Sequence, residues 1–116
     1  MARSMKLSTH VLDLSSGRPA AALIVRLHRH VDGSWHSIAA HRTDDNGRIP
    51  DLLSTGEELQ HGFYRLRFGT RAYFRTKELE SFHPFVDIVF EVRNPNEHHH
   101  VPLLITPHSY STYRGS

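Results

Sequence analysis

The sequence predicts an all-β fold: an antiparallel sandwich of two sheets, built from seven or eight strands with one short α-helix. Short runs in which apolar and polar residues alternate, the pattern of half-buried strands, recur along the whole chain. Clusters of Gly, Pro, Asn, Asp and Ser separate these runs and favour turns. The 116 residues suffice for one domain with a real core but not for two, so we expect a single domain over residues 1–116.

Seven runs can be placed in order along the chain. The expected strands cover residues 7–14, 22–30, 35–42, 49–53, 62–69, 85–93 and 98–106. The second run illustrates the argument, because Leu23, Val25 and Leu27 share one face when successive residues point to opposite sides. Asp32-Gly33 is a strong hairpin signal and joins this run to the third.

A tight turn precedes the fourth run. Asn46-Gly47 supplies residues that tolerate positive φ, so Arg48 is held at the exit of a well-defined turn. Such a position suits a functional side chain. The short run at 49–53 is expected to be an edge strand.

The two clearest strands flank the helix. At 62–69, Tyr64, Leu66 and Phe68 face one way, and at 85–93 four apolar residues from Val86 to Val92 do the same. Between them, residues 70–80 carry apolar side chains at roughly helical spacing, with Thr70 as the expected N-cap. We expect two or three helical turns packed on a sheet.

The last run combines a core strand with polar ends. Val101, Leu103 and Ile105 share the core face, and His99 falls on that side. The opposite face carries alternate residues, among them Pro102, which has no N–H for a sheet ladder. We therefore expect this strand at an edge or against an unusual neighbour. Apolar outward residues beside histidines also suit a subunit interface with a polar pocket.

Composition narrows the functional classes. Twelve of the fourteen basic residues are arginine, and they are spread along the chain rather than clustered as a nucleic-acid surface requires. The absence of cysteine excludes disulfides and thiolate chemistry, whereas eleven histidines are unusually many. Residues 1–6 are expected to be a flexible extension without the apolar stretch of a signal peptide or membrane span. A cytoplasmic protein with no membrane partner is the expectation.

Spacing alone leaves the role of the histidines open. His98 and His100 lie on one strand face, with alpha carbons roughly 6–7 Å apart, and two such residues can contribute to a zinc site. No other His, Asp or Glu group has convincing ligand spacing, so spacing favours solvated surface histidines over a metal site. His10 shares a face with Ser8 and Leu12, where a lone strand histidine is most often structural.

A resemblance to a known family adds what spacing cannot. The segments STHVLDLSSGRPA (8–20), TDDNGR (43–48), FHPF (82–85), HVPLL (100–104) and SYSTYRGS (109–116) resemble the 5-hydroxyisourate hydrolases, transthyretin-like enzymes of urate breakdown. The likeness runs from Leu7 to Ser116. The terminal Tyr-Arg-Gly-Ser is its most specific mark. His99, and the pair His108-Ser109, depart from residues that the family often has there.

The resemblance implies a site and an assembly. Carried over position by position, the family's catalytic residues are His10, Arg48 and His100. The resemblance also implies a homotetramer, a dimer of dimers with the sites between dimers, and it implies neither metal nor cofactor. The expected substrate-binding residues are His98, Tyr113, Arg114, Gly115 and Ser116.

The implied activity is a hydrolysis. Water would open the ring of 5-hydroxyisourate to give 2-oxo-4-hydroxy-4-carboxy-5-ureidoimidazoline, with a histidine moving protons and an arginine holding the developing charge. The sequence leaves open which histidine is the base. The runner-up hypothesis is a non-catalytic transthyretin-like carrier of a small aromatic ligand.

Overall fold

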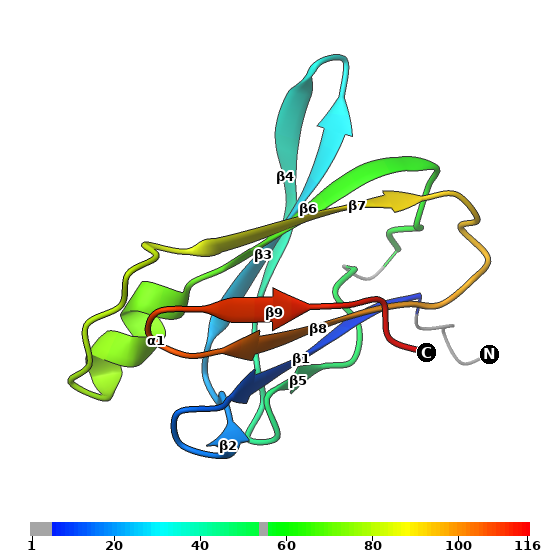
Figure 1. The fold of residues 1–116 in the computed structure, drawn as a ribbon. Coiled ribbons are helices and arrows are strands. Elements are labelled where there is room, and N and C mark those ends of the chain that lie inside the picture. Colours follow the sequence, from blue (N-terminus) through cyan, green and yellow to red (C-terminus); the bar gives the residue numbers. More distant parts are fainter. Residues whose placement is uncertain (1–5, 54–55) are drawn as a thin grey trace.

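A computed structural model of the chain describes residues 6–53 and 56–116, so residues 1–5 of the expected N-terminal extension lie outside it. Figure 1 shows two sheets, with a short helix at one end. The elements are β1 (Leu7–Asp13), β2 (Arg18–Pro19), β3 (Ile24–Val31), β4 (Ser34–Arg42), β5 (Arg48–Ile49), β6 (Gly62–Phe68), α1 (Thr70–Thr76), β7 (Val86–Val92), β8 (His99–Ile105) and β9 (Tyr110–Thr112). None of the described helical segments is long and apolar enough to cross a membrane.

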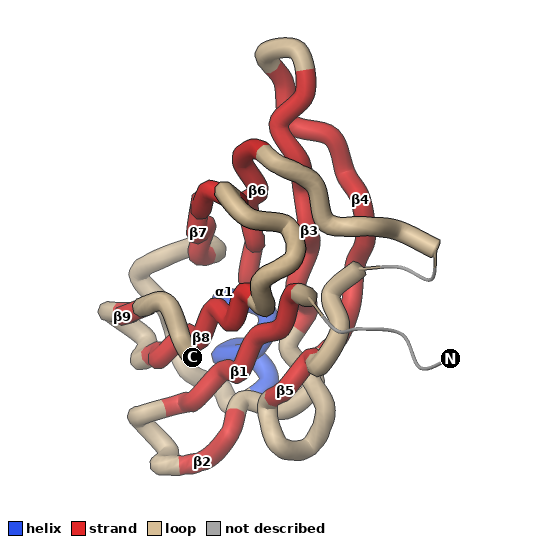
Figure 2. The backbone as a smooth tube through the Cα atoms, turned by 90° about the vertical axis from the view of Figure 1, so that its right-hand side faces the viewer, coloured by secondary structure: helices blue, strands red, loops and turns tan. Residues whose placement is uncertain are grey.

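The predicted two-sheet sandwich is confirmed. One sheet has the order β2-β1-β8-β9, with β5 also pairing with β1, and the other has the order β4-β3-β6-β7. Within the described residues the strand pairs are antiparallel except β1 with β8, which run parallel. The N-terminal strand and the last long strand are thereby neighbours (Figure 2), although about ninety residues separate them in the chain.

The core lies between the sheets, where the predicted faces meet. Leu23, Val25 and Leu27 are buried, and so are the alternating apolar residues of β6 and β8. Burying each large aliphatic side chain contributes about 1.5–3 kcal/mol, so these faces fix how the strands lie. His99 is buried as predicted on the core side of β8, where its Nδ1 is 2.9 Å from the main-chain oxygen of Glu97.

The turn before β5 differs in detail from the prediction. Gly47 has a φ of 74°, whereas Asn46 does not adopt positive φ. The Asp44 carboxylate instead accepts the N–H groups of Asn46 and Arg48, each at 2.9 Å. A Cβ on Gly47 would overlap the main-chain oxygen of Val11, so the turn sits tightly against β1. The expected edge strand at 49–53 is correspondingly shorter, because only Arg48–Ile49 pair with β1.

Two expectations about the helix are wrong. Gly69 rather than Thr70 is the N-cap, and the helix ends at Thr76 instead of continuing to residue 80. Glu78 has a φ of 60°, a left-handed conformation that an α-helix cannot contain. The buried Tyr73 and Phe74 hold the remaining helical turns against the core.

For the strand that carries Pro102, the sequence predicts an edge position or an unusual neighbour, and the edge position is wrong. β8 lies between β1 and β9, and Pro102 is buried within the single chain. Its carbonyl accepts a hydrogen bond from the Thr112 hydroxyl at 2.7 Å, so a side-chain donor takes the place of a main-chain N–H for this carbonyl. On the outer face of β8, Leu104 remains partly exposed.

Candidate active site

Three neighbouring strands place the candidate residues on one sheet face. In the strand register, His10 lies opposite Arg48 of β5 on one side and Pro102 of β8 on the other, and Ser8 lies opposite His100. Residues paired across strands point to the same side of a sheet. Because Val101 and Leu103 point into the core, this face is turned away from the second sheet.

The end of the chain closes over this face. The Gly115 N–H donates to the carbonyl of His100 at 2.9 Å, which brings the C-terminal residues beside the start of β8 (Figure 2). A Cβ on Gly115 would lie 2.5 Å from Cδ2 of the His100 ring. The tail and the imidazole are therefore packed in direct contact.

These residues surround a shallow pocket of about 340 Å³. It brings together four residues singled out from the sequence, Arg48, His98, His100 and Ser116. His10 stands next to Arg48 without lining the pocket itself. The lining residues are Ser8, Thr9, Arg48, Pro50, His98, His100 and Ser116.

Ser8 is a site residue that the sequence argument missed. Its Oγ lies 2.8 Å from Nε2 of His98 and 2.8 Å from Nδ1 of His100. The residue is only 7% exposed. The available signal was its position two residues before His10 on the same strand face, but nothing in the sequence showed which strand would lie beside it.

The environment of both key imidazoles lowers their pKa values and so favours the neutral form. Burial lowers the pKa of His100, and the charges of His98, Arg48 and His10 lower it further, while a main-chain contact with Ser8 opposes them. Burial followed by the Arg48 charge lowers the pKa of His10, against an opposing main-chain hydrogen bond with Asn46. A neutral imidazole near neutral pH can accept a proton, as a general base must.

Two of the expected substrate-binding residues lie elsewhere in the single chain. Tyr113 and Arg114 line a second cleft of about 240 Å³, which His100 also borders, beside Val89 and Phe90 of β7. The Arg114 guanidinium donates to the Glu97 carboxylate at 2.9 Å on the surface. His100 therefore borders two hollows: Ser116 lines the pocket that contains Arg48, whereas Tyr113 and Arg114 line the other cleft.

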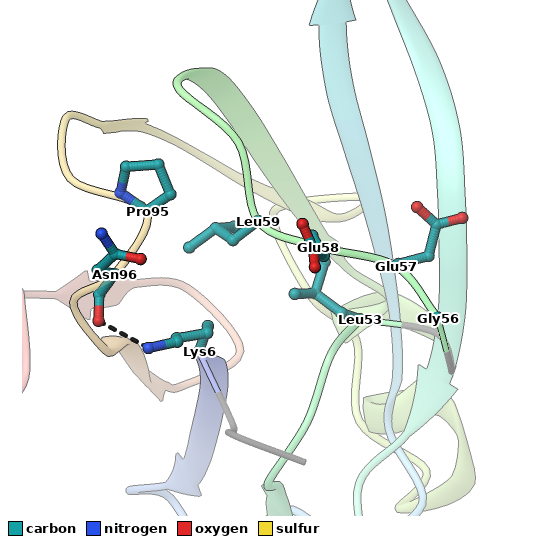
Figure 3. Close-up of a pocket in the computed structure, with 8 residues that line it drawn as sticks. All are labelled: Lys6, Leu53, Gly56, Glu57, Glu58, Leu59, Pro95 and Asn96. Atoms are coloured by element: carbon teal, nitrogen blue, oxygen red, sulfur yellow. Dashed lines mark hydrogen bonds between the residues drawn. The ribbon is translucent and has the colours of Figure 1, made fainter.

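A larger hollow, of about 420 Å³, has no histidine among its lining residues (Figure 3). Lys6 donates from Nζ to the Asn96 carbonyl at 2.7 Å at one wall, and Glu57 and Glu58 lie on the loop opposite. Its wall contains none of the sequence-predicted site residues, so size alone does not make it the better candidate. Within residues 6–53 and 56–116, no group of three or more His, Asp or Glu side chains is arranged to hold a metal ion.

Comparison with known proteins agrees with the resemblance seen in the sequence. Residues 7–115 match the model of the HIUase/Transthyretin family. The 5-hydroxyisourate hydrolase of Caulobacter vibrioides is 46% identical over 114 residues, covering 95% of this chain and 97% of that protein.

Solved structures give the same result. A Klebsiella pneumoniae 5-hydroxyisourate hydrolase has a TM-score of 0.85 and 37% identity over 97% of this chain and 100% of its own. Sparus aurata transthyretin has a TM-score of 0.88 and 30% identity, covering 97% of each chain. By its sequence and its fold, this chain belongs to the HIUase/Transthyretin family.

Proposed function

We propose that this protein is a hydrolase that opens the ring of 5-hydroxyisourate to 2-oxo-4-hydroxy-4-carboxy-5-ureidoimidazoline in urate degradation. The observation that carries the proposal is the convergence of Arg48, His100 and Ser116 on one pocket, with His10 beside Arg48. Relatives more than 40% identical over nearly the whole chain bear the name of this activity. That likeness supports the substrate, and the geometry supports the chemistry.

The roles follow from what each group can do. His100 lines the pocket and its pKa is lowered, chiefly by burial, so we assign it as the base that takes a proton from the attacking water. Arg48 supplies a guanidinium that stabilises the oxyanion formed at the attacked carbonyl. The ring C–N bond then breaks, and the protonated imidazole returns its proton to the leaving nitrogen. This chemistry uses side chains of the chain alone.

His10 and the tail complete the proposal. His10 sits across the strand pair from Arg48 and is proposed to position it and the substrate. Ser116 and His98 form part of the pocket wall, and Gly115 holds the tail against His100 through its hydrogen bond to the His100 carbonyl. Tyr113 and Arg114 are proposed to meet substrate only in an assembled form, since they line the second cleft beside His100 and not the pocket that contains Arg48.

We propose a homotetramer, a dimer of dimers with a site between dimers. The pocket is open and lies on a sheet face turned away from the second sheet, beside the partly exposed Leu12 and Leu104. A second copy of the same face would close it. Sedimentation of the purified protein tests the assembly, and a monomer with full specific activity would contradict it. The expected cytoplasmic location is a further proposal, for which cell fractionation is the test.

The activity is tested directly by following the ultraviolet absorbance of freshly prepared 5-hydroxyisourate with and without the protein. The compound also decays unaided, so the difference in rate is the result. We expect His100→Ala, His10→Ala and Arg48→Ala each to lower kcat/KM at least about a hundredfold, as removal of one acid–base or oxyanion group typically does. The exposed His61→Ala serves as the matched control and should keep wild-type activity.

The two main alternatives give different results in this assay. Losses of tenfold or less for all three variants would sink the assigned site. No acceleration by the wild-type protein would favour the non-catalytic carrier, which the likeness to transthyretin in fold also allows. Removal of residues 113–116, or fusion of a bulky tag after Ser116, should abolish activity while the chain stays folded.

A further inference from the structure

We propose that Ser8 and His98 form a proton relay with His100, which carries the proton taken from the attacking water away from the pocket base to the protein surface. This inference rests on the proposed hydrolase function and adds two residues to its machinery. The proposal is based on two contacts of the Ser8 hydroxyl, which lies 2.8 Å from Nε2 of His98 and 2.8 Å from Nδ1 of His100. The His98 and His100 rings, with centroids 6.1 Å apart, are thereby bridged by a single oxygen.

The bridge constrains where the protons are. A serine hydroxyl has one hydrogen to donate, so with a nitrogen on each side it donates to one imidazole and accepts from the other. In one arrangement His100 donates from Nδ1 to Ser8, and Ser8 donates to Nε2 of His98. Nε2 of His100 then carries a lone pair, which is the form a general base requires. The reverse arrangement places a proton on Nε2 and leaves no base.

The surroundings of the two histidines favour transfer of the positive charge from His100 to the exposed His98. An imidazolium on His100 would be half-buried and close to the guanidinium of Arg48 and to His10. His98 is exposed, so its charged form is solvated by water. Desolvation and like charges thus oppose a lasting proton on His100.

The relay consists of three successive proton transfers, in which no proton is gained or lost. Water gives a proton to Nε2 of His100 as its oxygen bonds to the substrate carbonyl. His100 releases its Nδ1 proton to Oγ of Ser8, and Ser8 releases its own hydrogen to Nε2 of His98. His98 ends as the imidazolium, His100 is neutral, and Ser8 is unchanged. Reversal of the same three transfers returns the proton to the leaving ring nitrogen.

The kinetic test compares Ser8→Ala, His98→Ala and His98→Gln with the wild-type protein. Glutamine can keep a hydrogen bond to Ser8 but cannot take up a proton. We expect each variant to lower kcat about tenfold with KM within about twofold, a smaller loss than removal of the base because water can partly replace the relay. The double variant Ser8→Ala/His98→Gln should be no slower than Ser8→Ala, since both changes interrupt one path.

Each competing role for these residues has its own signature. If His98 only binds substrate, KM rises and kcat holds. If it only positions Ser8, His98→Gln keeps wild-type kcat while His98→Ala does not. Wild-type kcat in both Ser8→Ala and His98→Gln would also overturn the relay. In all of these cases the wild-type protein is active, whereas failure of the hydrolase proposal itself shows as no acceleration by the wild type.

A second measurement is independent of activity. Nitrogen-15 NMR of the imidazoles reports which ring nitrogen of His100 carries the proton. We expect Nδ1–H in the resting wild-type protein and a shift towards Nε2–H in Ser8→Ala, because the other nitrogen's hydrogen bond sets the tautomer. Nε2–H in the wild type, or no change on loss of the hydroxyl, would overturn the relay even if both variants were slow.

Discussion

The contact between Gly115 and His100 explains why the C-terminal tail has a glycine at this position. Its backbone is not in the left-handed region, so conformational freedom does not explain the glycine. The explanation is space, because any Cβ would press on Cδ2, Cγ and Cβ of His100. Cδ2 is bonded to Nε2, the nitrogen assigned as the base, so a side chain here would displace the reacting atom rather than a distant part of the ring.

We therefore expect Gly115→Ala to lower kcat/KM at least about tenfold, because misplacement of a catalytic group by an ångström costs up to a hundredfold. The melting temperature should change little, since the tail packs outside the core. The measurement pairs the ultraviolet assay with thermal unfolding. Gly69→Ala is the matched control, because its nearest atom, the Ile24 oxygen, would be 3.4 Å from the added Cβ. Full activity in Gly115→Ala would show that the tail yields and does not hold His100.

At the scale of elements, one buried contact joins the helix to the site-bearing sheet. Asp13 ends β1, is 2% exposed, and accepts the Tyr73 hydroxyl of α1 at 2.8 Å. Burial alone would raise the pKa of Asp13, but hydrogen bonds from Ser15, Tyr73 and the Ser16 N–H outweigh it and lower the pKa. The same contact and burial raise the pKa of Tyr73 well above its usual range. The carboxylate thus remains charged inside the fold because donors surround it.

Tyr73→Phe removes one donor from a buried charge and should lower the free energy of unfolding by about 1.5–3 kcal/mol, the range for hydrogen bonds to charged groups. Urea unfolding followed by circular dichroism measures it. Tyr110→Phe, at an exposed position in β9, should change stability by less than about 0.5 kcal/mol, as surface substitutions do. Equal effects of the two substitutions would mean that the Asp13 contact contributes nothing specific.

The elements also show what a sequence can and cannot indicate. The alternation in β6 and β7 was visible because it depends on neighbours along the chain. The end of α1 was not, because Lys77, Glu78, Leu79 and Glu80 all suit a helix and only the tertiary fold turns Glu78 into a left-handed conformation. Pro102 misled for a related reason: the strand lies inside the sheet despite the missing N–H, and the Pro102 carbonyl accepts its hydrogen bond from the Thr112 hydroxyl, ten residues away.

For the candidate site too, only some of the residues could be predicted from the sequence. His10, Arg48 and His100 came from a family resemblance, whereas alternation showed only that His98 and His100 share a face. Ser8 could not be found, because its partners follow it by 90 and 92 positions and depend on the parallel pairing of β1 with β8. Long-range strand pairing is the part of this fold that local patterns leave undetermined.

Across the whole molecule, both sheets contain histidines whose pKa values are lowered by folding. The pKa values of four histidines, His10, His28, His99 and His100, are all lowered, in each case by burial first. For His28 on the second sheet, the charges of Arg65, Arg67 and Arg26 add to burial, and Asp87 opposes them. Folding thus prefers four neutral imidazoles, whose ordinary pKa is 6.5.

Acid should therefore destabilise the folded chain. Below pH 6.5 the unfolded chain binds protons that the folded chain does not, so the free energy of unfolding falls as the pH falls towards the lowered pKa values. We expect lower stability at pH 5.5 than at pH 7.5 in urea unfolding at one fixed protein concentration, since assembly also contributes. His28→Gln, outside the site, should make this dependence shallower without changing ring opening. Stability that holds or rises on acidification would show that the histidines become charged within the fold, and the neutral base assigned to the pocket would lose its electrostatic support.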